Sequence, residues 1–220
     1  MSTCLIPLRK GSKRLPDKNV RLLDGWPVFH YVLNIAHMSG LFDRIILALD
    51  GEYSELVNRY MPVGTTKYIR DKKNSRNESP LIDLVREVVD FYSIKDRSMC
   101  ILYSTSVLTT EWQLKQAYKI LHEGKYKCVF PIVSQEIELK TCIDMPHTYC
   151  INWQKEYGDK HADSFFMFDI KTVLESGSII QPESGYIELK DYEVQAVHTE
   201  EDFKDLEYKW RAMNGEVHRP

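Results

Sequence analysis

The residues of this chain most suited to chemistry lie in a basic loop, Arg9–Asn19, which reads RKGSKRLPDKN. Six of its eleven residues are Lys, Arg or Ser, whose side chains bind phosphate oxygens, and Gly11 lets a ligand approach the backbone closely. Fixed cations of this kind stabilise the negative charge that develops on a leaving pyrophosphate. A solvated basic turn would have the same composition. The position of the loop directly after an apolar run, typical of a buried strand, favours a site for a nucleotide triphosphate.

Two further polar positions follow apolar runs of the same kind. Asp50 comes after Arg44–Leu49, and Ser104–Ser106 comes after Met99–Tyr103. Because ligands of open parallel sheets bind at the carboxyl ends of the strands, we expect these positions to converge with the basic loop. Asp50 could bind a metal ion there or simply end the strand as a turn or helix cap. The chain contains neither G-x-x-x-x-G-K-S/T nor G-x-G-x-x-G, so the common phosphate-loop and dinucleotide-binding motifs are not indicated.

The spacing of apolar residues predicts which elements position these groups. Alternating strand and helix patterns are typical of an α/β fold, Rossmann-like, with a mostly parallel sheet and helices on both faces. The aromatic run Phe165–Phe168 indicates core packing. Strands are expected at Thr3–Leu8, Arg44–Leu49, Lys67–Arg70, Met99–Tyr103, Lys127–Val133 and Tyr192–Val197. Helices are expected with Pro27 in a first turn and Gly40 at the end, around Glu52–Tyr60, after Pro80, after a capping box of Thr110 and Gln113, near Asp169–Ser176, and after Thr199.

The composition restricts the class of protein. Hydrophobic residues make up 43% and the net charge is −3, which is typical of a globular protein with no overall attraction to nucleic acid or membrane. The five cysteines form no C-x-x-C pair, and the chain shows no signal-peptide pattern and no membrane-spanning run. We therefore expect a cytoplasmic protein. Residues 1–220 are expected to form one domain, in which the polar, irregular segment 134–164 is an insertion or dimer arm.

The basic loop also carries a family resemblance. Leu5–Val20, which reads LIPLRKGSKRLPDKNV, resembles the I-P-A-R-x-G-S-K-x-I/L-P-x-K-N signature of the acylneuraminate cytidylyltransferases, with Leu8 for the usual Ala and Lys10 for the usual Gly. The subgroup that it most resembles activates sugars such as pseudaminic or legionaminic acid. Further segments similar to family motifs run along nearly the whole chain: Gly40–Arg44 (GLFDR), Tyr68–Arg70 (YIR), Leu102–Leu108 (LYSTSVL), Tyr192–Gln195 (YEVQ) and Thr199–Phe203 (TEEDF).

The resemblance implies a fold of the nucleotide-diphospho-sugar transferase type and a magnesium-dependent enzyme. Such an enzyme transfers CMP from CTP to a nine-carbon 2-keto sugar acid and releases pyrophosphate, as a homodimer built through roughly residues 134–164. Arg9 and Lys18 would be catalytic, with Lys18 stabilising the transition state. Nucleotide binding would fall to Arg9, Gly11, Ser12, Lys13, Asn19 and Arg70, and sugar binding to Tyr103, Thr105 and Ser106.

One departure from the family pattern concerns the metal. Family members carry D-I-D before T-x-E-D, and those aspartates hold Mg²⁺, whereas this chain has Ala196-Val197-His198. Asp50, Asp163 or the triphosphate itself could hold Mg²⁺ in a rearranged site, and His198 could be a ligand or a structural residue. Alternatively, the chain is a non-catalytic homologue that binds a nucleotide or a partner. A third hypothesis is a cytidylyltransferase for a shorter keto sugar such as 3-deoxy-octulosonate, because Arg14-Leu15-Pro16 resembles the corresponding segment of the octulosonate cytidylyltransferases.

Overall fold

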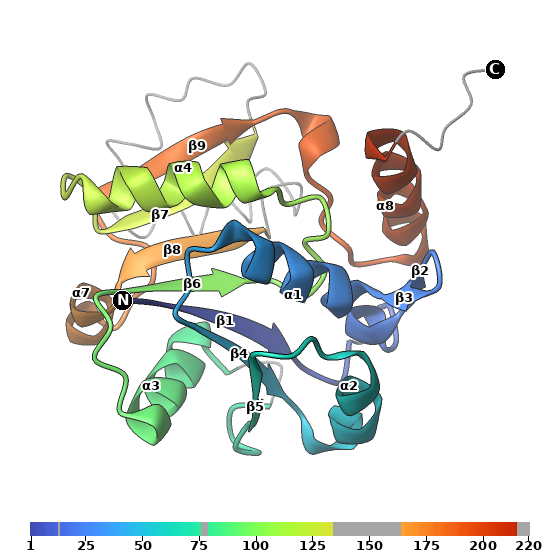
Figure 1. Ribbon diagram of the computed structural model, residues 1–220, viewed down its shortest axis with the longest axis horizontal. Helices are drawn as coiled ribbons and strands as arrows, with labels where there is room; N and C mark the ends of the chain where they lie inside the picture. The colour runs from blue at the N-terminus through green and yellow to red at the C-terminus, as the bar shows by residue number, and fades with distance from the viewer. Residues whose placement is uncertain (13, 76–78, 134–163, 215–220) are drawn as a thin grey trace.

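The fold is built on one sheet of seven strands. The structure, a computed structural model, describes residues 1–12, 14–75, 79–133 and 164–214 (Figure 1). Within these residues the strand order is β5-β4-β1-β6-β8-β7-β9, and β8 runs antiparallel to both of its neighbours while the other pairings are parallel. The predicted Rossmann-like, mostly parallel sheet is therefore confirmed. The strands are β1 (Ser2–Leu8), β4 (Arg44–Leu49), β5 (Thr65–Ile69), β6 (Ser98–Leu102), β7 (Cys128–Val133), β8 (Phe165–Asp169) and β9 (Ser184–Leu189).

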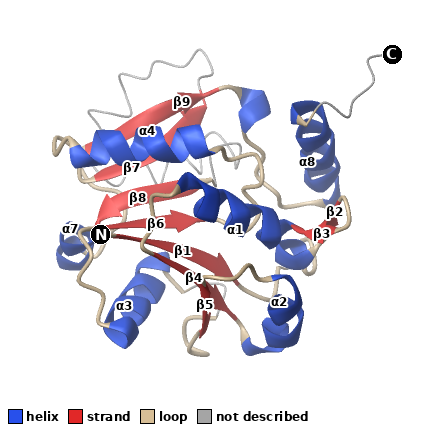
Figure 2. Ribbon diagram, viewed as in Figure 1, coloured by secondary structure: helices blue, strands red, loops and turns tan. Residues whose placement is uncertain are grey.

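Helices cover both faces of the sheet, because its central strands bury side chains on both sides (Figure 2). In β1, Cys4, Ile6 and Leu8 pack into one apolar cluster, whereas Leu5 packs into the other, as the two-residue strand period requires. The first cluster takes in α1 (Val28–Ser39), α2 (Ser54–Tyr60), α4 (Glu111–His122) and α8 (Glu200–Met213), and the second takes in α3 (Leu81–Tyr92) and α7 (Ile170–Ser176).

Local capping fixes where several helices begin and end. Thr110 and Gln113 form the predicted capping box of α4, and Thr199 with Asp202 forms another at α8. Gly40 closes α1 in the left-handed conformation, with φ of 65°. Pro27 corrects one prediction: it lies at the N-cap in an extended conformation, just before α1 rather than inside its first turn. It belongs to a two-stranded ribbon of β2 (Leu22–Leu23) and β3 (Trp26–Pro27).

The predicted strand Tyr192–Val197 is wrong. A short 3-10 turn, η3 (Asp191–Glu193), begins this segment, and the strand that pairs with β7 in parallel is β9, further upstream. Lys209 of α8 explains why the segment needs no partner strand. Its Nζ donates hydrogen bonds to the carbonyl oxygens of Asp191 and Val194, at 2.8 and 2.9 Å, so those backbone groups are satisfied by a side chain rather than by a ladder.

Three of the five cysteines lie in the described residues, all of them in the apolar core. Cys4, Cys100 and Cys128 are buried and form no disulfide, and burial raises the pKa of the Cys100 thiol. Such thiols act as small apolar side chains. Cys142 and Cys150, like the predicted arm 134–164 apart from Ser164, lie outside the described residues. Within the described parts of the chain, every helix is too short or too polar to cross a bilayer.

Candidate active site

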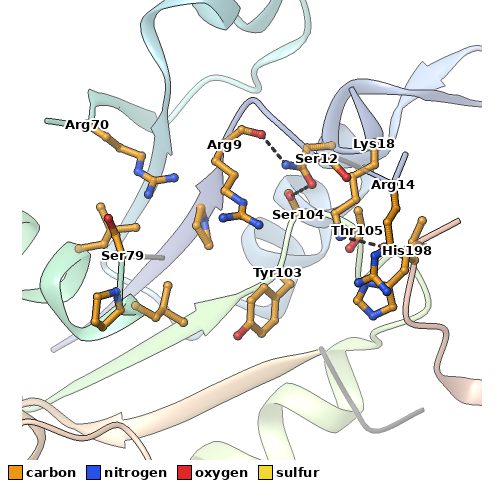
Figure 3. A pocket seen from close by; sticks show the side chains of 16 residues that line it. Arg9, Ser12, Arg14, Lys18, Arg70, Ser79, Tyr103, Ser104, Thr105 and His198 are labelled. Atoms are coloured by element: carbon orange, nitrogen blue, oxygen red, sulfur yellow. Dashed lines mark hydrogen bonds between the residues drawn. The ribbon is translucent and has the colours of Figure 1, made fainter. Parts of the chain in front are cut away.

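A cavity of about 470 Å³ opens at the carboxyl ends of β1 and β6, where Figure 1 also shows the loop after β1 and the start of α8. This is the edge at which open parallel sheets bind ligands. Segments far apart in the sequence meet there, and Figure 3 shows their side chains pointing into a common space. The lining residues are Pro7, Arg9, Ser12, Arg14, Lys18, Asn19, Arg70, Ser79, Pro80, Leu81, Leu84, Tyr103, Ser104, Thr105, Val197 and His198.

The basic loop is braced from within, which distinguishes it from a solvated turn. Asn19, in the 3-10 turn η1 (Lys18–Val20), is buried, and its Nδ2 donates to the carbonyl oxygen of Arg9 at 2.7 Å. Its Oδ1 accepts a hydrogen bond from Ser104 Oγ at 3.0 Å. Leu15, at the middle of the loop, is only 2% exposed and packs into the core. Both ends of the loop are therefore held to each other and to the strand-end residues of β6.

Asp50 braces the same loop from the other side. It is 6% exposed, and its Oδ2 accepts a hydrogen bond from the backbone N–H of Lys10 at 2.6 Å. Its Oδ1 accepts a hydrogen bond from Ser75 Oγ at 2.6 Å. Asp50 is not among the cavity-lining residues. Both carboxylate oxygens are thus used to anchor backbone and loop, and its assignment as a metal ligand stays a prediction.

Arg70 brings a second guanidinium group to the cavity from the end of β5. Its Nη2 donates to the carbonyl oxygen of Asn74, while its buried Nε has no hydrogen-bond partner among the described residues. Burial lowers the pKa of Arg70, an effect that the nearby Asp50 and Glu87 carboxylates oppose. In Figure 3 the guanidinium groups of Arg70 and Arg9 point toward the same space. This wall can bind an anion or a carbonyl-rich ring edge.

The opposite wall is polar and uncharged. It is formed by Tyr103, Ser104 and Thr105, which follow β6, whereas Ser79, just before α3, lies beside Arg70 in Figure 3. Ser106, predicted to contact sugar, points elsewhere, because its Oγ donates to the carbonyl oxygen of Ser164 at 3.0 Å. It lines a separate, much smaller cavity rather than the main one. Hydroxyl groups on this wall can both donate to and accept from a polyhydroxylated ligand.

The segment before α8 closes the cavity through two contacts with the loop. Lys18 Nζ donates to the carbonyl oxygen of Val197 at 2.8 Å. Arg14 Nη2 lies 2.9 Å from Nδ1 of His198, the contact drawn as a dashed line in Figure 3. Because a guanidinium group only donates, His198 Nδ1 must be the acceptor. Residues 9–19 and 196–198 therefore form one site, although they lie at opposite ends of the chain.

The predicted site residues divide into three groups. The first lies on the cavity: Arg9, Ser12, Lys18, Asn19, Arg70, Tyr103 and Thr105. The second lies off it: Gly11, whose φ of 91° shapes the loop, together with Ser106 and Asp50. Lys13 lies outside the described residues. Sequence reasoning did not assign Arg14 and Ser79 to the site; the signal for Arg14 was its place in the same basic run.

The residues on this cavity do not fit the magnesium site that the family pattern implies. Mg²⁺ in proteins is bound through one or two carboxylates together with substrate phosphates and water. None of the described residues that line the cavity is Asp or Glu. The described residues also contain no group of three or more His, Cys, Asp or Glu side chains that could hold a metal ion.

The arrangement suits a polyphosphate. Arg9, Arg14, Lys18 and Arg70 converge on the cavity, and every charged side chain in its described lining is cationic. Cations held in a fixed geometry stabilise transition-state charge without reorganising during the reaction. The uncharged wall opposite provides a place for a second, hydroxyl-rich reactant. Two substrates, one anionic and one rich in hydroxyl groups, could therefore meet in this cavity.

Comparison with solved structures supports the fold. CMP:2-keto-3-deoxy-manno-octonic acid synthetase, in a structure complexed with CTP, superposes with a TM-score of 0.69 at 12% identity, covering 98% of this chain and 99% of that one. The 4-diphosphocytidyl-2C-methyl-D-erythritol synthase of Anaerococcus prevotii superposes with a TM-score of 0.66 at 13% identity, covering 96% and 98%. The chain thus has the sheet architecture of nucleotide-sugar transferase-like cytidylyltransferases.

Comparison of sequences adds the family. The pseudaminic acid cytidylyltransferase of Campylobacter jejuni subsp. jejuni serotype O:2 is 27% identical over 93% of this chain and 93% of that protein. The N-acylneuraminate cytidylyltransferase of Streptococcus agalactiae serotype V is 32% identical, over 52% of this chain and 27% of that protein. The profile of the family described as cytidylyltransferase matches residues 3–203. With its basic loop and cation-lined cavity inside the matched region, the chain belongs to the cytidylyltransferase family and is a nucleotidyltransferase.

Proposed function

We propose that this chain transfers CMP from CTP to a nine-carbon 2-keto sugar acid of the pseudaminate or sialate type and releases pyrophosphate. The observation that carries the proposal is the convergence of Arg9, Arg14, Lys18 and Arg70 on one cavity at the strand ends, opposite a hydroxyl-rich wall. The full-length similarity to a pseudaminic acid cytidylyltransferase supports the choice of sugar class. The basic loop would bind the triphosphate, and the wall after β6 would face the sugar.

The proposed reaction is an in-line displacement. The anomeric hydroxyl oxygen of the sugar forms a bond to the α-phosphorus, and the bond from that phosphorus to the bridging oxygen breaks. Pyrophosphate leaves with the electron pair, and the hydroxyl proton is released. Lys18, held by the carbonyl oxygen of Val197, stabilises the charge that develops on the transferred and leaving phosphates. Arg9 binds the same phosphates from the braced start of the loop.

The remaining assignments distribute the two substrates over the cavity. Arg70, whose buried Nε has no hydrogen-bond partner among the described residues, contacts the cytidine beside Ser79 at the start of α3. Tyr103 and Thr105 contact the sugar acid on the opposite wall. Asn19 contributes to nucleotide binding by fixing the backbone of Arg9, since its amide is used within the loop. We further propose that the protein acts as a homodimer in which residues 134–164 form the arm.

A pyrophosphate-release assay tests the proposal. The four common nucleoside triphosphates are each combined with pseudaminic acid, legionaminic acid, N-acetylneuraminic acid and 3-deoxy-octulosonic acid. We expect turnover with CTP and a nine-carbon acid, with kcat/KM at least about tenfold above that for the eight-carbon acid, because missing hydroxyl contacts leave polar groups of the site unpaired. The CMP-sugar product is identified by mass spectrometry.

Three results would contradict this assignment in different ways. Turnover with the eight-carbon acid alone would assign the shorter sugar as substrate. A preference for another nucleotide would remove the cytidine assignment. CTP binding in calorimetry without turnover of any sugar would favour the non-catalytic homologue. That alternative is motivated by the replacement of the two family aspartates by Ala196 and His198.

A further inference from the structure

The feature that the proposed function leaves unexplained is the charge of the segment before α8. The family pattern calls for two carboxylates there, but this chain has Ala196 and His198. His198 and its neighbour Val197 lie on the cavity. Both touch cations of the basic loop, Val197 through its carbonyl oxygen and His198 through its ring nitrogen. In the segment where the family pattern has metal-binding carboxylates, this chain thus has groups that contact the side chains of Lys18 and Arg14.

The pair of Arg14 and His198 has only one workable proton arrangement. The Arg14 guanidinium group has no acceptor atom, so His198 Nδ1 carries no proton in this contact. The neutral ring then positions the guanidinium group without cancelling its charge. An aspartate at position 198 would instead pair with Arg14 as an anion and neutralise it. The imidazole therefore preserves a positive charge at this end of the cavity.

The charge balance supports binding of a polyanion without added metal. Arg9, Arg14, Lys18 and Arg70 provide four positive charges. A nucleoside triphosphate carries about four negative charges, of which the single terminal phosphate holds about −1.5 to −2. None of the described lining residues is a carboxylate, and the Asp50 and Glu87 carboxylates that act on Arg70 lie outside that lining. A divalent cation held by the protein at this place would be repelled by all four. The side chains thus supply the neutralisation that a metal ion would otherwise supply.

We propose that this chain binds the nucleotide triphosphate without a protein-held divalent cation, and that Arg14, positioned by His198, takes the place of that cation. Arg14 is a phosphate-binding residue in this scheme, and His198 is a positioning residue. The proposal rests on the proposed function for the identity of the nucleotide. It does not rest on it for the phosphate chemistry, because inorganic tripolyphosphate carries the same recognised group. Arg14 is exposed before ligand binds, so its contribution should be moderate rather than decisive.

Isothermal titration calorimetry on metal-stripped protein tests the proposal. CTP and inorganic tripolyphosphate are titrated separately, in EDTA and in excess Mg²⁺. We expect each dissociation constant to agree within about threefold between the two conditions. Binding at least about tenfold weaker in EDTA would overturn the proposal, and Asp163→Asn would then show whether that residue holds the metal. Metal-independent binding of tripolyphosphate with no binding of CTP would sustain the proposal while removing the proposed nucleotide.

Variants separate the two residue roles. Arg14→Gln should weaken metal-free tripolyphosphate binding about tenfold, because one charge-assisted phosphate contact is lost. Arg59→Gln, at an exposed arginine of α2 outside the cavity, is the matched control and should leave the affinity unchanged. Equal affinities for Arg14→Gln and the control would overturn the assignment of Arg14.

Restoring the two acidic residues should make triphosphate binding depend on Mg²⁺. Ala196→Asp combined with His198→Asp should weaken metal-free binding and make binding at least about tenfold tighter in Mg²⁺ than in EDTA. His198→Asp alone serves if the double variant does not fold, as judged by thermal unfolding. It should raise the ratio of the dissociation constant in EDTA to that in Mg²⁺ in the same direction as the double variant, but by a smaller factor. If His198 were purely structural, the substitution would alter stability but not this ratio. An unchanged ratio in a folded variant would contradict the role of His198.

Discussion

The basic loop and the segment before α8 line the same cavity but are held there by different means. The loop, residues 9–19, is fixed by buried groups: Asn19 joins it to Ser104, and Asp50 joins it to the end of β4. The segment 196–198 is fixed by the start of α8, where Asp202 Oδ2 accepts hydrogen bonds from the backbone N–H groups of His198 and Thr199 at 2.8 and 2.7 Å. One wall is anchored in the core and the other in a helix cap.

The difference predicts which wall tolerates change. Buried, fully used hydrogen-bond groups are costly to lose, whereas cap and surface contacts of α8 are partly shared with water. α8 itself is joined to the loop side by a bidentate pair of Arg21 with Glu200, at 2.5 and 2.7 Å, and by the ring contact of Tyr31 with Trp210. The loop should therefore control catalysis and stability strongly, and the α8 side should adjust them by smaller amounts.

The largest effect is expected at the loop cation Lys18. Lys18→Ala should lower kcat for pyrophosphate release about 100- to 1,000-fold, the usual loss for one group that stabilises transition-state charge. The midpoint of thermal unfolding should move little, because Lys18 is only half-buried and its side chain keeps contact with solvent. Lys119→Ala, at an exposed lysine of α4, is the control. Turnover retained by Lys18→Ala would remove the residue from the chemical step.

A smaller but still large effect is expected from the buried brace. Asn19→Ala leaves the Arg9 carbonyl and the Ser104 hydroxyl without their partner, which should cost about 1–3 kcal/mol in the free energy of unfolding. Urea denaturation measures this, and kcat/KM should fall by about tenfold as Arg9 loses its position. Asn58→Ala, at an exposed asparagine whose Oδ1 accepts from Lys67, should stay within about 0.5 kcal/mol. Equal losses at the two positions would erase the contrast between braced loop and surface.

The smallest effect is expected at the cap of the α8 wall, and it should depend on pH. Partial burial raises the pKa of Asp202, but the hydrogen bonds from the backbone N–H groups of His198 and Thr199 outweigh it and hold the pKa below its ordinary value of 3.8. Because the folded-state pKa is lowered, the charged cap stabilises the protein above pH 3.8, and this stabilisation is lost as the pH falls through the folded pKa.

Asp202→Asn should therefore cost about 0.3–1 kcal/mol near pH 7 and approach no cost in strong acid. Urea denaturation at both pH values measures the change. Asp205→Asn, exposed one turn further along α8, is the matched control. A cost for Asp202→Asn that does not fall with pH would mean that the charge of the cap contributes nothing.

The elements that sequence patterns predicted well are those whose signal is local. The strands β1, β4 and β6 are continuous apolar runs buried on both faces, and the caps at Thr110 and Thr199 are fixed by a residue three positions further on. β8 and β9 were missed for a non-local reason. β8 has an apolar run, Phe165–Phe168, but its antiparallel insertion between β6 and β7 is recorded by no local pattern. β9 is an edge strand whose buried positions alternate, so it lacks the continuous apolar run of the central strands.

The same distinction between local and non-local information applies to the site. The sequence by itself determined the basic loop, its place after the first strand and its family signature, because residue type and short-range order carry that information. Tertiary structure alone decided that Asp50 braces the loop, that Ser106 turns away from the main cavity, and that Arg14 meets His198 across 184 positions of sequence. The last of these contacts depends on how α8 packs against the rest of the fold, and all three join segments that are distant in the chain, whose packing no local periodicity records.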